Sequence, residues 1–265
     1  EAVHALFPTL SSFERDFPSF CFALATGIGK TRLMGACIAY LRYEKGIKNF
    51  FVMAPNLTIY DKLKADLGNT SNPKYVFKGL DLFAKPPRII DGDNYADFRQ
   101  GTFGVNDVVI NVFNISKLNA ESKGKNGEPA RIKRLNEVLG TSYFEYLQSL
   151  PDLCIFMDES HHYHADKSFD VINDLKLILG VELRPILGVE LTATPQIQKG
   201  AKAVPFKNVV YEYSLAHALK DERYVKVPAV FTRKDFRPEE YTPEQLDHEK
   251  LNDGLRIHEE TKSHL

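Results

Sequence analysis

Short apolar segments alternate with amphipathic segments along most of this chain. The apolar segments have the length of β-strands and are rich in Val, Ile and Phe, which indicates that both of their faces are buried. The stretches Lys30–Tyr43 and Asn56–Leu67 carry apolar residues at helical spacing. This alternation predicts an α/β fold, with a mainly parallel sheet and helices on both of its faces. The predicted strands are Phe20–Leu24, Phe50–Ala54, Tyr75–Phe77, Val108–Phe113, Leu153–Met157, Ile186–Leu191 and Val209–Tyr213.

Two segments interrupt this alternation. Lys85–Gln100 includes the pair Pro86–Pro87, and Asn119–Pro129 is rich in Lys, Gly, Asn and Glu. Such compositions are typical of turns and loops, so both segments are predicted to be surface excursions. We expect residues 1–225, with these excursions, to form one domain.

A helix-capping motif lies near the C-terminal end of the sequence. Thr242, Pro243 and Gln245 supply an N-cap, a proline at the first helical position and a capping-box partner. A polar helix is therefore predicted to start here. We expect residues 226–265 to form a connector and polar helix that lead toward a second domain outside this chain.

Composition narrows the class of protein. The 265 residues are 43% hydrophobic, enough for a sizeable core, and 34 Lys and Arg nearly balance 35 Asp and Glu. With a net charge of −1, any contact with nucleic acid must be local. No apolar run reaches the length of about 18 residues that spans a bilayer. The cysteines lack metal-knuckle spacing, so we expect reduced thiols, no membrane partner and a cytoplasmic location.

A glycine-rich segment follows the first predicted strand and opens the first predicted helix. Gly27 and Gly29 allow the backbone N–H groups to face an anion, where the helix dipole also favours negative charge. Lys30 would reach the β- and γ-phosphates of ATP, and Thr31 would ligate Mg²⁺. The usual first glycine of such a loop is replaced by Leu24, and a ligand-free glycine turn is the alternative. The predicted nucleotide-binding residues are Ala25, Thr26, Gly27, Ile28, Gly29, Lys30, Thr31 and Arg32.

Two adjacent carboxylates follow the predicted strand Leu153–Met157. They are expected at the carboxyl edge of the sheet, where open α/β sheets bind ligands. Asp158 is placed to hold Mg²⁺, while Glu159 can activate the attacking water as a general base. Alone, such a pair is more often solvated and idle, but the phosphate loop upstream favours the catalytic interpretation.

Histidines and threonines extend this candidate site. His161, His162 and His164 could suggest zinc, but no ligand set with the usual spacing accompanies them. We instead expect His161 to sense the γ-phosphate side of the site. Thr192 and Thr194 end another predicted strand, and their hydroxyls can hydrogen-bond back toward the acidic pair, as suits a switch coupled to hydrolysis.

The order of these motifs resembles that of superfamily two helicases. The segments ATGIGKT, MAPN, DESH and TAT follow one another as they do in those motors. The segments NFFVMAPNLTIYDKL, DESHH and GVELTATPQ most resemble the Res-subunit group of type III restriction enzymes and related translocases. The resemblance implies a RecA-like P-loop NTPase domain, the first of two. It also implies contacts from Pro55 and Asn56, and from Asn114 to Lys117, to a nucleic-acid backbone.

The resulting expectation is an ATP-dependent translocase or helicase motor that uses Mg²⁺. The resemblance favours duplex DNA over RNA as the track and suggests a methyltransferase partner. An RNA helicase and a nucleotide-binding regulatory module without turnover remain alternatives. No second RecA-like unit is recognisable after Tyr213, so these residues are expected to supply half of an ATP site and no nuclease.

Overall fold

The computed structural model describes residues 5–15, 17–91, 94, 108–114, 146–147, 149–163, 185–199, 202–221 and 236–262. The chain divides into two compact units, Glu1–Lys226 and Val227–Leu265. The first unit contains the sheet and both segments of the candidate site. The second contains the helix α10, Pro243–Lys262.

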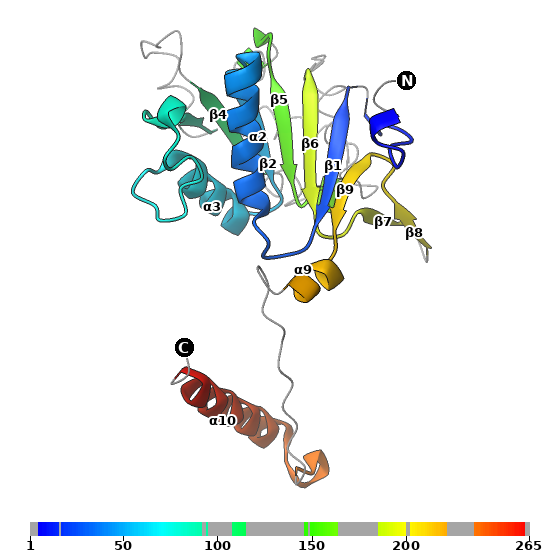
Figure 1. Ribbon diagram of the computed structural model, residues 1–265. Helices are drawn as coiled ribbons and strands as arrows, with labels where there is room; N and C mark the ends of the chain where they lie inside the picture. Colours follow the sequence, from blue (N-terminus) through cyan, green and yellow to red (C-terminus); the bar gives the residue numbers. More distant parts are fainter. Residues whose placement is uncertain are drawn as a thin grey trace, which may run out of the picture. The chain divides into compact units, whose positions relative to one another are not determined.

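A seven-stranded parallel sheet forms the centre of the first unit (Figure 1). Every neighbouring pair in it is parallel. Its order is β3-β4-β2-β5-β6-β1-β9, so β6 lies between β1 and β5. This topology confirms the mainly parallel α/β fold. The strands are β1 Ser19–Leu24, β2 Asn49–Ala54, β3 Arg88–Ile90, β4 Val109–Asn114, β5 Cys154–Asp158, β6 Leu187–Thr192 and β9 Val209–Tyr213.

The helices α2, Lys30–Lys45, and α3, Leu57–Gly68, pack against this sheet and close its main core. Alternation along the strands directs Phe50, Val52 and Phe156 toward the two helices. The opposite strand face is buried as well, because Phe51, Met53, Phe113, Ile155 and Met157 are at most 4% exposed. Strands buried on both faces explain why the sequence shows continuous apolar runs here.

Smaller elements complete the described parts. The antiparallel pair β7, Gln196–Lys199, and β8, Lys202–Pro205, follows β6. The helix α9, Leu215–Asp221, follows β9. Short 3₁₀ turns occupy Asp81–Phe83, Ser160–Tyr163 and Pro238–Glu240.

Two sequence predictions were wrong in detail. Tyr75–Phe77 is a turn and not a strand, and Tyr75 and Phe77 are buried because their rings pack in an aromatic cluster. The rings of Phe77 and Phe83 stack with centroids 4.1 Å apart, and Tyr75 packs edge-on against Phe77. The predicted surface excursion Lys85–Gln100 contains the edge strand β3, which pairs with β4. The other excursion, Asn119–Pro129, lies outside the described residues.

The second unit bears out the predicted capping box. The Thr242 hydroxyl accepts the N–H of Gln245 at 3.3 Å, and the Gln245 side-chain oxygen accepts the N–H of Thr242 at 3.0 Å. These reciprocal bonds satisfy donors that a helix start leaves unpaired. Proline takes the first helical position, as predicted, and the helix is exposed along most of its length.

Candidate nucleotide-binding site

The glycine-rich loop joins the end of β1 to the start of α2. Gly27 and Gly29 have φ values of +88° and +105°, in the left-handed region that glycine adopts without a Cβ clash. The N–H of Ala25 bonds to the carbonyl of Tyr213 at 3.0 Å, which ties the loop to β9. No side chain caps the start of α2. Its first N–H groups are therefore free of a side-chain acceptor, as an anion site at a helix N-terminus requires.

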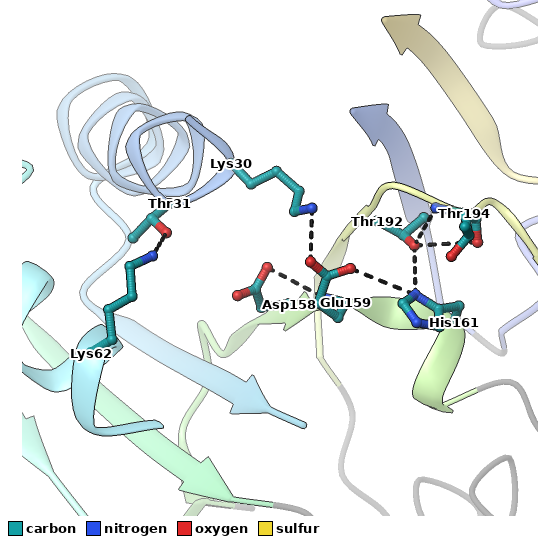
Figure 2. A network of polar contacts seen from close by, with 8 residues as sticks. All are labelled: Lys30, Thr31, Lys62, Asp158, Glu159, His161, Thr192 and Thr194. Atoms are coloured by element: carbon teal, nitrogen blue, oxygen red, sulfur yellow. Dashed lines mark hydrogen bonds and ion pairs between the residues drawn. The ribbon is translucent and has the colours of Figure 1, made fainter. Parts of the chain in front are cut away.

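The two predicted halves of the site meet across the end of β6. Asp158 is the last residue of β5, and Glu159 follows it directly. Lys30 Nζ lies 2.8 Å from Glu159 Oε1, so the first residue of α2 reaches over the intervening strand (Figure 2). The Lys30 side chain is 10% exposed and that of Glu159 is 21% exposed. This ion pair holds the loop against the acidic pair.

Asp158 is held in a poorly hydrated position. It is 5% exposed and lies on the face of the sheet that α2 and α3 cover, with Cys154 and Phe156. Burial and the neighbouring Glu159 charge raise its pKa to about 6, although Lys30 and Lys62 oppose the shift. The carboxylate is therefore poised to gain stability from a cation.

Glu159 has an unusual backbone and engages both of its carboxylate oxygens. Its φ of +51° is rare for a residue with a side chain and costs of order 1–2 kcal/mol. Oε1 faces Lys30, while Oε2 lies 3.6 Å from His161 Nδ1. Backbone strain of this kind clusters at functional sites. Glu159 thus connects Lys30 of the loop to His161.

His161 and Thr192 form the next step of this network. His161 Nδ1 lies 2.9 Å from the hydroxyl oxygen of Thr192, which is fully buried at the end of β6. The Thr192 hydroxyl also accepts the backbone N–H of Thr194 at 3.1 Å. Thr192 therefore reaches toward the acidic pair through His161, while Thr194 joins the network by its backbone (Figure 2).

A cavity of about 490 Å³ opens beside the loop. Asp158 and Glu159 form part of its wall, and Thr26, Gly27, Gly29, Lys30, Thr31 and Arg32 form another part. Ala25 is buried beneath the loop and Ile28 is partly buried, so neither lines the cavity. Thus most of the predicted nucleotide-binding residues surround one space. Its remaining lining is Ile59, Lys62, Asp66, Lys74 and Val76.

Lys62 of α3 is the contact that sequence reasoning missed. Its Nζ donates to the hydroxyl of Thr31 at 3.0 Å (Figure 2). The same Nζ lies 3.8 Å from Asp66 Oδ2. In the sequence, the Lys62 and Asp66 spacing indicates only a helical ion pair. The approach to Thr31 depends on how α2 and α3 pack, which no local pattern reveals.

The predicted nucleic-acid contacts lie at the same carboxyl edge of the sheet. Ala54 of β2 pairs in register with Asn114 of β4, so Pro55 and Asn56 follow on beside Asn114. The Asn56 side chain caps α3 by accepting the N–H of Ile59 at 2.9 Å. Lys117 lies outside the described residues.

The described parts of the chain contain neither a cluster of metal-binding side chains nor a helix that could cross a membrane. No group of three or more His, Cys, Asp or Glu side chains there is arranged to hold a metal ion. The rings of His161 and His162 are tilted by 36°, with centroids 4.2 Å apart, and His164 is outside the described residues. No helix there is both long enough and apolar enough to cross a bilayer.

A curated relative matches part of this chain in sequence. The probable type III restriction-modification enzyme HindVIP Res subunit of Haemophilus influenzae is 26% identical over an alignment of 162 residues, which covers 57% of this chain. The chain covers 27% of that relative's length.

Three solved structures with some likeness to this chain are two restriction-modification enzymes and an ATPase core. A nuclease-deletion mutant of the Type ISP enzyme LlaGI with a DNA substrate mimic has a TM-score of 0.45 at 13% identity, covering 84% of this chain and 20% of that one. The Type ISP enzyme LlaBIII bound to DNA has a TM-score of 0.49 at 12% sequence identity. The match covers 83% of this chain and 15% of that one. The Sulfolobus solfataricus SWI2/SNF2 ATPase core with double-stranded DNA has a TM-score of 0.35 at 17% sequence identity. The match covers 68% of this chain and 28% of that one.

The family comparison covers most of the described sheet. The profile described as "Type III restriction enzyme, res subunit" matches residues 2–197, from before β1 to the start of the β7–β8 pair. This range contains the glycine-rich loop, the acidic pair and the Thr192–Thr194 segment. The chain therefore belongs to the family of type III restriction enzyme Res subunits.

Proposed function

We propose that this chain is the ATP-binding half of a motor that hydrolyses ATP to move along duplex DNA. One observation carries the proposal: Lys30 of the glycine-rich loop pairs at 2.8 Å with Glu159 beside a cavity that both line. A phosphate-binding lysine and a candidate general base are thereby held together before nucleotide arrives.

Thr31 and Asp158 suit Mg²⁺ as ligands. A hydroxyl and a carboxylate are the hard oxygen donors that this ion prefers. The ammonium group of Lys62 already contacts Thr31, so a cation is accommodated at this place. When bound, Mg²⁺ would neutralise charge that develops on the phosphates during transfer.

The chain's own residues then divide the work. Lys30 would exchange its contact with Glu159 for one with the β- and γ-phosphates, next to the N–H groups at the start of α2. Glu159 Oε1 would thereby become free to accept a proton from the attacking water. Oε2 stays near His161, which links the carboxylate to Thr192. This chain of contacts is our candidate for coupling hydrolysis to movement.

The track and partners are proposals that rest on the family. A related Res subunit belongs to a restriction-modification enzyme, which favours DNA as the track and a methyltransferase subunit as a partner. Pro55, Asn56, Asn114 and Lys117 are the proposed backbone contacts. The three free cysteines fit the proposed cytoplasmic location.

Turnover by the full-length protein tests this proposal. Glu159→Gln keeps nucleotide binding but removes the general base, so ATPase activity stimulated by duplex DNA should fall at least about 100-fold. Glu212→Gln, an exposed site on β9, is the matched control and should leave activity unchanged. Unchanged turnover in Glu159→Gln would favour a regulatory module. Stimulation by RNA but not by duplex DNA would favour an RNA helicase.

A further inference from the structure

A lysine ammonium stands beside the hydroxyl that we assign to Mg²⁺. Lys62 Nζ donates to Thr31 Oγ1 at 3.0 Å, and its second close partner is Asp66, 3.8 Å away on the next turn of α3. The Lys62 charge also acts on Asp158, because it lowers the pKa of that carboxyl against the stronger effect of burial. The ammonium therefore lies within the field of both proposed magnesium ligands (Figure 2).

The surroundings explain why a cation is held there. Asp158 is 5% exposed and Asp66 is 4% exposed, so each carboxylate has lost much of its hydration. Lys62 is half exposed, and its long stem lets the ammonium enter the cavity or leave it for water at little cost. A cationic group and Mg²⁺ cannot occupy the same oxygen-lined position together.

We propose that Lys62 is a built-in cation that holds the magnesium position and is displaced when Mg²⁺-nucleotide binds. The proposal rests on the proposed function, since it takes Thr31 and Asp158 as the magnesium ligands. After displacement, the Lys62 ammonium would pair with Asp66. This carboxylate lies four residues further along the same helix and is already 3.8 Å from Lys62 Nζ.

This arrangement changes how strongly nucleotide affinity depends on Mg²⁺. Without the metal, Lys62 partly neutralises Asp158, so ATP phosphates meet less repulsion. With Lys62 removed, that help is lost, whereas saturating Mg²⁺ supplies its own charge. The ratio of the Kd in EDTA to the Kd in Mg²⁺ should therefore rise about fivefold in Lys62→Met, the size expected of a half-exposed charge contact. By linkage, the Mg²⁺ concentration that half-saturates the nucleotide complex should fall by the same factor.

Equilibrium titration of the full chain with a fluorescent, non-hydrolysable ATP analogue measures both quantities. Lys74→Met is the matched control, because Lys74 lines the same cavity and its removal changes the charge equally. It should leave the ratio unchanged. Lys62→Gln serves as a second variant, and far-UV circular dichroism checks that each variant is folded.

The outcomes separate the inference from the proposed function. A wild-type chain that binds the analogue in neither EDTA nor Mg²⁺ contradicts the proposed function itself. If the wild type binds but both Lys62 variants keep its ratio, the inference is wrong and the proposed function stands. An equal rise in Lys74→Met would assign the effect to the general charge of the cavity and would also overturn it.

Discussion

Asp158 should reduce the stability of the nucleotide-free protein, so replacing it with a neutral isostere should make the fold more stable. The carboxyl is 5% exposed, and burial, followed by the Glu159 charge, raises its pKa from 3.8 to about 6. At pH 8 the group is charged in both the folded and unfolded states, and only the folded state bears the cost of burying it. The pKa difference corresponds to about 3 kcal/mol of unfolding free energy.

The sign of the effect fixes its pH dependence. Below pH 3.8 the carboxyl is neutral in both states and costs nothing, and the cost grows as pH rises toward about 6. Asp158→Asn should therefore gain about 3 kcal/mol at pH 8 and about half as much at pH 5. The same variant should lose Mg²⁺-dependent nucleotide binding, because the amide carries no negative charge.

Urea denaturation followed by far-UV circular dichroism measures the gain, since the chain contains no Trp to report by fluorescence. With a slope of about 3 kcal/mol per M, the midpoint should rise by about 1 M at pH 8. Asp61→Asn, exposed on α3, is the control and should stay within about 0.5 kcal/mol of the wild type. A lower midpoint for Asp158→Asn at pH 8, or a gain that is the same at pH 5, would refute the reasoning.

Two further predictions concern buried contacts away from the nucleotide. Arg15→Met removes the 3.4 Å ion pair of the fully buried Glu190. The free energy of unfolding, measured by urea denaturation, should fall by about 3–5 kcal/mol, and adding Glu190→Gln should restore more than half of that loss. Gly68→Ala places a Cβ 2.3 Å from Ile89 Cγ1, so a crowding cost of about 1–3 kcal/mol should exceed the helix-propensity gain of about 1 kcal/mol. Adding Ile89→Ala should relieve that crowding; a stabilised Gly68→Ala single variant would contradict it.

The parts of the fold that the sequence predicted have strong local signals. The strands at β1, β2, β4, β5, β6 and β9 are short and mostly apolar, and α2 begins at a glycine-rich loop of recognisable pattern. The Thr242 capping box is likewise a local chemical unit, and its two hydrogen bonds are present. In each case the residues that decide the structure are adjacent in sequence.

The wrong predictions concern segments whose structure depends on distant partners. Tyr75–Phe77 contains strand-forming residues, yet the N–H of Val76 bonds to the carbonyl of Asp66 at the end of α3, and the aromatic rings pack among themselves. β3 has only three residues beside two prolines, and it is a strand because β4 offers a free edge. Neither contact leaves a periodic signal.

The candidate site likewise combines features that the sequence predicted with features that depend on distant partners. Position in chain order predicted that the loop and the acidic pair would meet, because parallel strands bring their carboxyl ends to one edge. The 2.8 Å contact of Lys30 with Glu159, the left-handed backbone of Glu159 and the approach of Lys62 to Thr31 all arise from tertiary packing. The sequence therefore predicted which residues would lie at the candidate site, while the structure supplied the contacts between them.

Helix α3 has a mechanical consequence for this site. Asn56 caps its start and Lys62 lies six residues further on, about 9 Å along the axis. A continuous hydrogen-bonded segment of this length moves as one body. Any shift of α3 that draws Lys62 away from Thr31 also displaces Pro55 and Asn56, for which we propose contact with the DNA backbone. Metal binding and contact with the track would then be coupled through one rigid helical segment that is less than two turns long.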